Sequence, residues 1–286
     1  MADDRKTTSP PPGGGLAKAA LAPLELTGGT VLGLLDHIGG VAWLLAETIG
    51  WLVRGIVSRK TRLGKAAIIT QIVRVGARSV FIVALVSGCV GLILAFQLSP
   101  PLDQFGQKEI VANIIGVAVL RELGPLIGAI VLTGYAGASI AAEIGTMVVS
   151  EEIEALEAHA LDPVRFLVVP RVVATVISMT ALAIIADVVA ISASLLIAVT
   201  VLDIPYATYM TNTLTQAKLV DFLTGVSKGT IFGLLIGLIA CHNGLRVTGG
   251  AAGVGRATTA TVVQCVVAIV IADLAFTAVY FALKLT

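Results

Sequence analysis

The chain has 286 residues and a formal net charge of +1, and 57% of its residues are hydrophobic while 13% are charged. Soluble domains carry about 25% charged residues, so this composition and the mean hydropathy of +0.98 predict an all-α polytopic membrane protein. Aromatic residues are few and no basic stripe is present, which argues against nucleic-acid binding. The cysteines lie in apolar runs and the histidines are scattered, so neither a disulfide framework nor a metal site is expected.

The N-terminal part is expected to contain a tail and an interfacial helix. Residues 1–20 are predicted to form a disordered cytoplasmic tail, because they begin with charges, a Ser-Pro-Pro-Pro run and three glycines. Residues 24–57 mix apolar and charged positions and carry Trp43 and Trp51 eight residues apart. This pattern is typical of an amphipathic helix in the membrane interface. The alternative is an additional span over 38–57, interrupted only by Glu47.

Long apolar stretches predict five membrane-spanning helices. Their approximate ranges are 68–98, 112–149, 164–202, 219–241 and 257–283. The third range is longer than one upright crossing requires at about 1.5 Å per residue. Since no turn signal divides it, we expect one tilted or protruding helix.

The distribution of lysine and arginine predicts a cytoplasmic N-terminus, because these residues favour the cytoplasmic side. The chain is therefore expected to be a multi-pass membrane protein whose N-terminus lies in the cytoplasm. In this orientation only Lys108, Lys218 and Lys284 lie outside. The cytoplasmic set comprises Arg54, Arg59, Lys60, Arg62, Lys65, Arg74, Arg78, Arg165, Arg171, Arg246 and Arg256.

A short acidic segment, residues 150–162, separates the second and third spans on the cytoplasmic side. Ser150 is a suitable N-cap for a helix, and the glutamates after it suit the positive helix end. Ile153, Leu156 and Ala160 fall on one face by helical spacing. The proline at 163 is expected to stop the helix. Such a helix is either a solvated connector or a docking element for another protein.

Small residues predict close packing in two spans. Gly225, Gly229, Gly233 and Gly237 form one stripe, which lets another backbone approach within one subunit or between two. The second span carries two neighbouring stripes, which are Gly134-Ala138-Ala142 and Gly137-Ala141-Gly145. The glycine-rich run 249–255 is interpreted as a flexible cytoplasmic turn, since no P-loop motif is present. If ATP drives this protein, another chain must hydrolyse it.

Five charged residues interrupt the apolar spans. Each costs roughly 2.5–3.5 kcal/mol at a helix centre unless it is paired or faces water. They either form structural ion pairs or line a cavity for an amphiphile, whose anionic headgroup would favour the two cations. The residues are Arg121, Glu122, Asp187, Lys228 and Asp273.

Several ordered motifs closely resemble the MlaE/YrbE permease family, and the similarity covers about residues 60–283. They are Arg121-Glu122-Leu123-Gly124-Pro125, residues 137–147, residues 151–156, Leu161-Asp162-Pro163-Val164-Arg165, Pro170-Arg171 and residues 253–259.

The resemblance implies a non-enzymatic permease subunit of an ABC transporter that moves phospholipids or other hydrophobic molecules. Such a permease works as a homodimer with two ATPase subunits and a periplasmic MCE-domain protein, expected as a hexamer. This chain then holds no cofactor, since ATP and magnesium bind to the ATPase. The acidic segment corresponds to a coupling helix, with Glu151, Glu152, Ile153, Leu156 and Asp162 as contact residues. The residues that line or support the lipid cavity correspond to Arg121, Glu122, Asp221, Lys228 and Asp273.

Two other functions remain open at this point. An ion-coupled secondary transporter would use Asp187, Lys228 and Asp273 as a relay. A membrane scaffold would need none of these charges for lipid handling.

Overall fold

The computed structural model describes residues 14–57 and 64–284, and every regular element within them is a helix. The chain divides into two compact units, one ending at Trp43 and one beginning at Leu44. In the described part of the first unit, the chain forms the N-terminal portion of α1 (Gly14–Val57). The tail predicted over residues 1–20 lies outside the described residues as far as residue 13, and residues 14–20 belong to α1.

The second unit contains the spans. Five continuous helical segments are long and apolar enough to cross a membrane, which confirms the predicted number. They are Lys65–Gln104, Lys108–Val149, Val164–Thr200, Leu219–Leu245 and Gly250–Ala282. Among the described residues α1 is not one of these segments. Its interfacial position stays a prediction.

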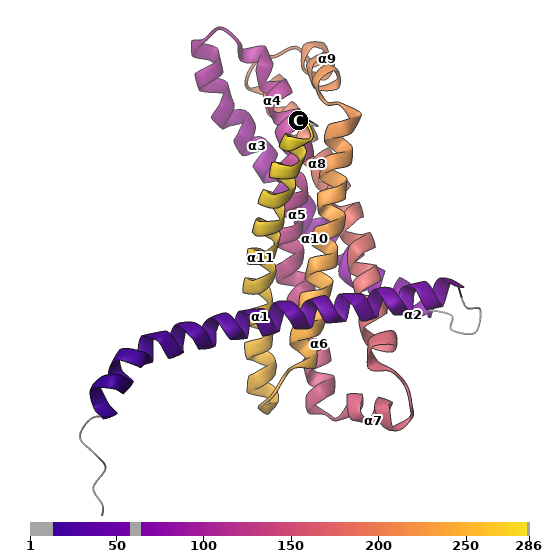
Figure 1. Cartoon of the computed structure of the whole chain (residues 1–286). Coiled ribbons are helices and arrows are strands. Elements are labelled where there is room, and N and C mark those ends of the chain that lie inside the picture. Colours follow the sequence, from indigo (N-terminus) through magenta and orange to yellow (C-terminus); the bar gives the residue numbers. More distant parts are fainter. Residues whose placement is uncertain (1–13, 58–63, 285–286) are drawn as a thin grey trace, which may run out of the picture. The chain divides into compact units, whose positions relative to one another are not determined.

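The first two spans are built from several pieces (Figure 1). The first comprises α2 (Lys65–Gln71), η1 (Ile72–Gly76), η2 (Ala77–Ser79) and α3 (Val80–Gln104). The second comprises η3 (Lys108–Ile110), α4 (Val111–Ala118), η4 (Val119–Leu123), α5 (Gly124–Leu132), η5 (Thr133–Gly137) and α6 (Ala138–Val149). Segments η1, η4 and η5 are single π-helical turns, a distortion that is frequent at functional sites.

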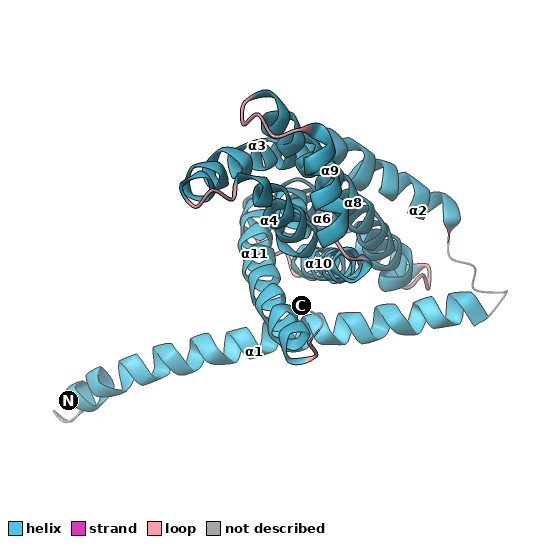
Figure 2. Ribbon diagram, turned by 90° about the horizontal axis from the view of Figure 1, so that it is seen from above, coloured by secondary structure: helices cyan, strands magenta, loops and turns pink. Residues whose placement is uncertain are grey.

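The remaining elements complete the bundle. They are α7 (Glu152–Ala158), η6 (Val164–Val168), α8 (Val169–Thr200), α9 (Tyr206–Gln216), α10 (Leu219–Leu245) and α11 (Gly250–Ala282). Helix α8 packs along α3, α5 and α10, and Figure 2 looks down these helices. As predicted, residues 164–200 form one uninterrupted helical segment.

The predicted glycine stripe of α10 packs against helices of the same chain. A Cβ added at Gly225 would overlap the carbonyl oxygen of Leu120 in η4, and one at Gly233 would lie 2.9 Å from the carbonyl oxygen of Thr175 in α8. At Gly237 it would lie 3.1 Å from the Cα of Val172. The contact that the spacing left open is therefore within one subunit.

The two stripes of the second span behave differently. A Cβ added at Gly145 would lie 2.8 Å from Val247, and one at Gly137 would lie 3.5 Å from Ile236, so this stripe packs on the α10 side. At Gly134 an added Cβ would meet nothing within 4 Å. The stripe that begins at Gly134 therefore does not pack closely along its whole length.

The start of the acidic helix was predicted incorrectly. Ser150 does not cap α7, because its hydroxyl donates to the carbonyl oxygens of Thr146 and Met147 in the preceding helix. The N-cap position belongs to Glu151, whose φ of 59° places it in the left-handed region. This conformation turns the chain sharply between α6 and α7.

The end of the acidic helix also differs from the prediction. Helix α7 ends at Ala158, and the Leu161 N–H donates to the Leu156 carbonyl at 3.0 Å. With Ala160 at a φ of 56°, this is a Schellman motif. Pro163 therefore does not stop α7 but introduces the next helix, where a proline is tolerated.

The glycine-rich run 249–255 was predicted incorrectly as a flexible turn. The turn ends at Gly249, which has a φ of 84°, and α11 begins at Gly250. Gly253 is buried against the Thr248 carbonyl, so it permits a close approach rather than flexibility.

Candidate functional site

The charged residues of the spans form two neighbouring ion-pair groups, and both include residues of η4. The π-helical turn places the adjacent Arg121 and Glu122 toward different partners on α10. The Arg121 guanidinium pairs with Asp221 at 2.5 Å. Asp221 also accepts the Lys218 backbone N–H at 2.9 Å, so it closes the first turn of α10.

Lys228 is the centre of the second group. Its ammonium donates to Glu122 at 2.6 Å, to Asp273 at 3.0 Å and to the Thr277 hydroxyl at 2.9 Å. The three hydrogen bonds use all three N–H groups of the lysine. The Thr277 hydroxyl donates in turn to the other oxygen of Glu122 at 2.9 Å. Elements η4, α10 and α11 are thereby joined by one polar network.

The residues of the second group differ in how far their side chains are exposed. The Lys228 side chain is 1% exposed, whereas that of Glu122 is 34% exposed and that of Asp273 is 17% exposed. A buried cation thus lies behind two partly exposed carboxylates. All five residues predicted to line or support a cavity take part in these groups. Of the five charges that interrupt the spans, four therefore form ion pairs, and Asp187 does not. Arg121, Glu122 and Asp273 are partly exposed, whereas Lys228 and Asp221 are buried.

Asp187 stands apart from this network. Its side chain is buried in α8, neither carboxyl oxygen has a hydrogen-bond partner among the described residues, and it lies directly on Gly124. Lys228 and Asp273 make no hydrogen bond with it. The relay that would use Asp187, Lys228 and Asp273 is therefore not connected by hydrogen bonds.

A second cluster of charges lies near the end of α6 that leads into α7. Glu143 pairs with Arg74 of η1 at 2.5 Å and with Arg171 of α8 at 3.3 Å. The Ser139 hydroxyl donates to the same carboxylate at 3.3 Å. Glu143 interrupts an apolar span, which is a partial signal of such a cluster, but its partners lie far away in the chain. A cavity of about 480 Å³ adjoins this cluster.

Helix α7 presents the predicted amphipathic pattern. Ile153 and Leu156 are half-buried, while Glu151, Glu152 and the other side chains of the helix are exposed. Asp162 is placed differently from the other predicted contact residues. Its carboxylate accepts the backbone N–H groups of Val164 at 2.8 Å and Arg165 at 3.3 Å, so it caps the following helix.

Asp162 also connects the α7 region to α1. The Trp51 indole N–H donates to its carboxylate at 3.2 Å, and the Arg165 guanidinium lies 5.4 Å from the Trp51 ring centroid. Arg54 lies over the same ring at 5.2 Å. Burial, and then the charge of Asp162, raise the pKa of Glu47 in α1. The C-terminal half of α1 is thus held at the start of the third span.

Asp162→Ala is expected to destabilise the protein by about 1 kcal/mol, because a helix loses its capping side chain. Trp51 also loses its acceptor, and since the chain has two tryptophans we expect a change in intrinsic tryptophan emission. Thermal unfolding and fluorescence spectra measure both effects. Asp103→Ala is the matched control, because Asp103 is an exposed aspartate on α3, away from Trp51. Equal behaviour of the two variants would contradict this capping role.

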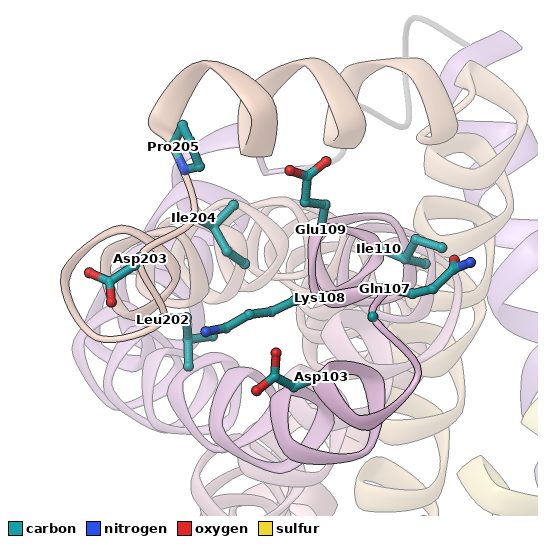
Figure 3. A pocket seen from close by; sticks show the side chains of 10 residues that line it. Asp103, Gln107, Lys108, Glu109, Ile110, Leu202, Asp203, Ile204 and Pro205 are labelled. Atoms are coloured by element: carbon teal, nitrogen blue, oxygen red, sulfur yellow. The ribbon is translucent and has the colours of Figure 1, made fainter.

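A polar pocket lies at the other end of α8 from α7. It has a volume of about 460 Å³ and lies between the α3–α4 connection and the α8–α9 connection (Figure 3). Lys108 extends into it between Asp103 and Asp203. Beside it, the buried Tyr209 hydroxyl lies 2.6 Å from that of Ser194, and burial raises its pKa. In the predicted orientation this end faces the periplasm.

Comparisons with known proteins agree with this architecture. The family model described as Permease MlaE matches residues 68–279. A probable ABC transporter permease protein of Rickettsia prowazekii is 36% identical over 222 residues, which cover 78% of this chain and 86% of the relative. A probable ABC transporter permease protein of Rickettsia bellii is 34% identical over 256 residues, which cover 88% and 99% of the two chains. Protein TRIGALACTOSYLDIACYLGLYCEROL 1, chloroplastic, of Arabidopsis thaliana is 33% identical over 211 residues, which cover 74% and 60%.

The five spans and these similarities define the class of protein as a multi-pass membrane permease of the ABC transporter type. Within that class, the chain belongs to the MlaE permease family. A permease of this type requires a partner ATPase.

Proposed function

We propose that this chain is the membrane subunit of a transporter that moves phospholipid, or a similar hydrophobic molecule, between the inner membrane and a periplasmic MCE protein. The main support for a lipid substrate is the Lys228 network, which places partly exposed carboxylates within apolar spans. A polar group embedded in an apolar surface matches the two ends of an amphiphile. The name of the Arabidopsis relative, which refers to a galactolipid, supports a lipid substrate.

The assembly that we propose is a homodimer with two ATPase subunits that bind ATP and magnesium. Only 11% of the apolar window of α11 is buried, and Val267, Ile271 and Leu274 are among its exposed residues. This long apolar face suits contact with a second copy or with lipid. At the opposite end of the bundle, the polar pocket beside α9 is our proposed contact region for the MCE protein.

Coupling to the ATPase is assigned to α7. This helix joins the second and third spans, and its half-buried Ile153 and Leu156 form an apolar patch among exposed acids. When the ATPase pair closes, movement of α7 would be transmitted to α6 and η6, which flank it. The spans that carry Arg121 and Glu122 then shift relative to α10.

Leu156→Asp is expected to abolish association with the ATPase, because a charge replaces the apolar centre of the docking surface. Co-purification of the two subunits and permease-dependent ATP hydrolysis measure the effect. Leu214→Asp makes the same change at an exposed leucine of α9 and is expected to leave both unchanged. If Leu156→Asp retained a fully active complex, α7 would not be the docking element.

The lipid substrate has a separate test. Native mass spectrometry of the purified permease–ATPase complex is expected to show bound phospholipid. An ion-coupled secondary transporter, the second candidate, is favoured by the buried and unpartnered Asp187. Collapse of the proton gradient while ATP remains distinguishes the two, because it would stop only ion-coupled transport.

A further inference from the structure

The cytoplasmic half of the first span carries more positive charge than its neighbours neutralise. Glu143 is shared by two guanidinium groups, those of Arg74 and Arg171. Arg78, one turn beyond Arg74, is exposed and makes no hydrogen bond or ion pair with any residue in the described ranges. Arg74, Arg78 and Arg171 thus have Glu143 as their one carboxylate partner among the described residues.

Three cavities meet at these arginines. One of about 120 Å³ lies between the first and second spans and is lined by Arg74, Arg78, Gln71, Tyr135 and Glu143, among others. A groove of about 550 Å³ follows the first span past Arg74 and Arg78, and the third cavity, of about 480 Å³, borders Arg74 and Arg171. Of the residues lining these cavities in the described chain, Glu143 is the one acid.

The smallest cavity also presents hydrogen-bond donors without partners. The Tyr135 hydroxyl and the Gln71 amide line it and make no side-chain hydrogen bond within the described residues. A guanidinium, a hydroxyl and an amide around one space match the oxygens of a phosphate group, which accepts several hydrogen bonds and pairs well with arginine.

The surface next to Arg78 is apolar. Phe81, Ile82 and Leu85 lie three, four and seven residues beyond it, so they share its face of the span. Their exposed fractions are 78%, 43% and 55%. The charged end of this stripe lies toward α7, and its apolar end continues along α3 toward the middle of the span. A molecule with a phosphate at one end and acyl chains at the other fits both ends.

We propose that Arg78, together with Tyr135 and Gln71, binds the phosphate of an anionic lipid in the membrane leaflet nearer α7. The site is separate from the Lys228 network and goes beyond the proposed transport function. Arg74 shows where the site lies along the bundle, because it lines the same cavity and pairs with Glu143, six residues before the end of α6. Bound lipid here contacts η1, η2 and η5, so it bridges the first two spans.

The test measures lipid binding by the intact permease–ATPase complex without ATP. The complex is reconstituted into phosphatidylcholine nanodiscs with and without phosphatidylglycerol, and retained lipid is counted by native mass spectrometry. Arg78→Gln is expected to weaken phosphatidylglycerol retention roughly tenfold, because it removes a charge-assisted hydrogen bond. Tyr135→Phe, which removes one hydroxyl, is expected to weaken it by a smaller factor.

Lys65→Gln is the matched control, because Lys65 is an exposed cation of the same span that does not line these cavities. It is expected to retain the lipid. Unchanged retention in Arg78→Gln, or an equal loss in both variants, would overturn the proposal. Full displacement of the lipid by glycerol 3-phosphate would also overturn it, because the site would then bind a soluble ligand. Loss of the dimer with unchanged lipid retention would overturn it as well, because the site would then be a contact between copies. Because this test measures lipid binding and not transport, a negative result would not contradict the proposed transport function.

Discussion

Lys228→Met is expected to destabilise the protein by about 3–5 kcal/mol, because it leaves two carboxylates without their cation. Lys228 is 1% exposed and holds Glu122 at 2.6 Å and Asp273 at 3.0 Å. Without it the carboxylates repel each other inside apolar helices, and one of them must take up a proton or reach water. Thermal unfolding of the detergent-purified complex measures the loss, and Lys218→Met, which changes an exposed lysine at the N-cap of α10, is the control.

A rescue separates charge balance from a direct role in lipid handling. Combining Lys228→Met with Glu122→Gln and Asp273→Asn removes all three charges and is expected to restore much of the stability. If lipid remains bound in the neutral variant, the charges serve the fold. If stability returns but bound lipid is lost, the network contacts the headgroup. A stability loss in Lys228→Met no larger than in Lys218→Met would contradict the paired geometry.

The same network explains why these charges persist in the membrane. A buried ion pair is weak evidence for stability, since desolvation offsets the attraction. The network instead joins η4, α10 and α11 by hydrogen bonds. These bonds define which residues face each other, which apolar contacts alone would not do. A shift of η4, which the nine-residue helix α5 separates from η5, would change the contacts of Arg121 and Glu122 together. The pairs are thus placed to respond to movement of the second span.

The spans could be predicted from the sequence because hydropathy is a local property. The predicted range 219–241 and the observed Leu219–Leu245 begin at the same residue. The partner of Arg121 could not be predicted, because Arg121 and Asp221 are 100 residues apart and meet only through the packing of η4 on α10. Nor did the sequence show that Asp187, unlike the other charges that interrupt the spans, has no hydrogen-bond partner among the described residues.

The acidic segment shows a different limit. Its position and its amphipathic face follow from the sequence. Its caps depend on left-handed backbone conformations that the residue types at these positions do not indicate. A serine before two glutamates is a standard N-cap pattern, yet the left-handed Glu151 moves Ser150 into the preceding helix. Ala160 fills a left-handed position where glycine is usual. Both left-handed residues lie in the connections that join α7 to its neighbouring helices.

Gly225→Ala is expected to disrupt both ion-pair groups at once. The new methyl group would overlap the carbonyl oxygen of Leu120, and a backbone atom cannot rotate away as a side chain can. Overpacking of this kind costs about 1–3 kcal/mol, and more where backbone segments must separate. Because Leu120 precedes Arg121 and Glu122, moving η4 away from α10 would lengthen the contacts to Asp221 and Lys228.

Gly134→Ala is the control for this change, because it makes the same substitution in a span where an added Cβ meets nothing within 4 Å. It is expected to leave the unfolding temperature within the error of the wild type or to raise it slightly, since alanine favours helix. Thermal unfolding and retained lipid are measured for both variants. Two equally stable variants would mean that α10 and η4 do not approach as closely as Gly225 requires, and the alignment of Lys228 with Glu122 would then have to be revised. A loss confined to Gly225→Ala would show that this glycine sets the distance on which the whole charged network depends.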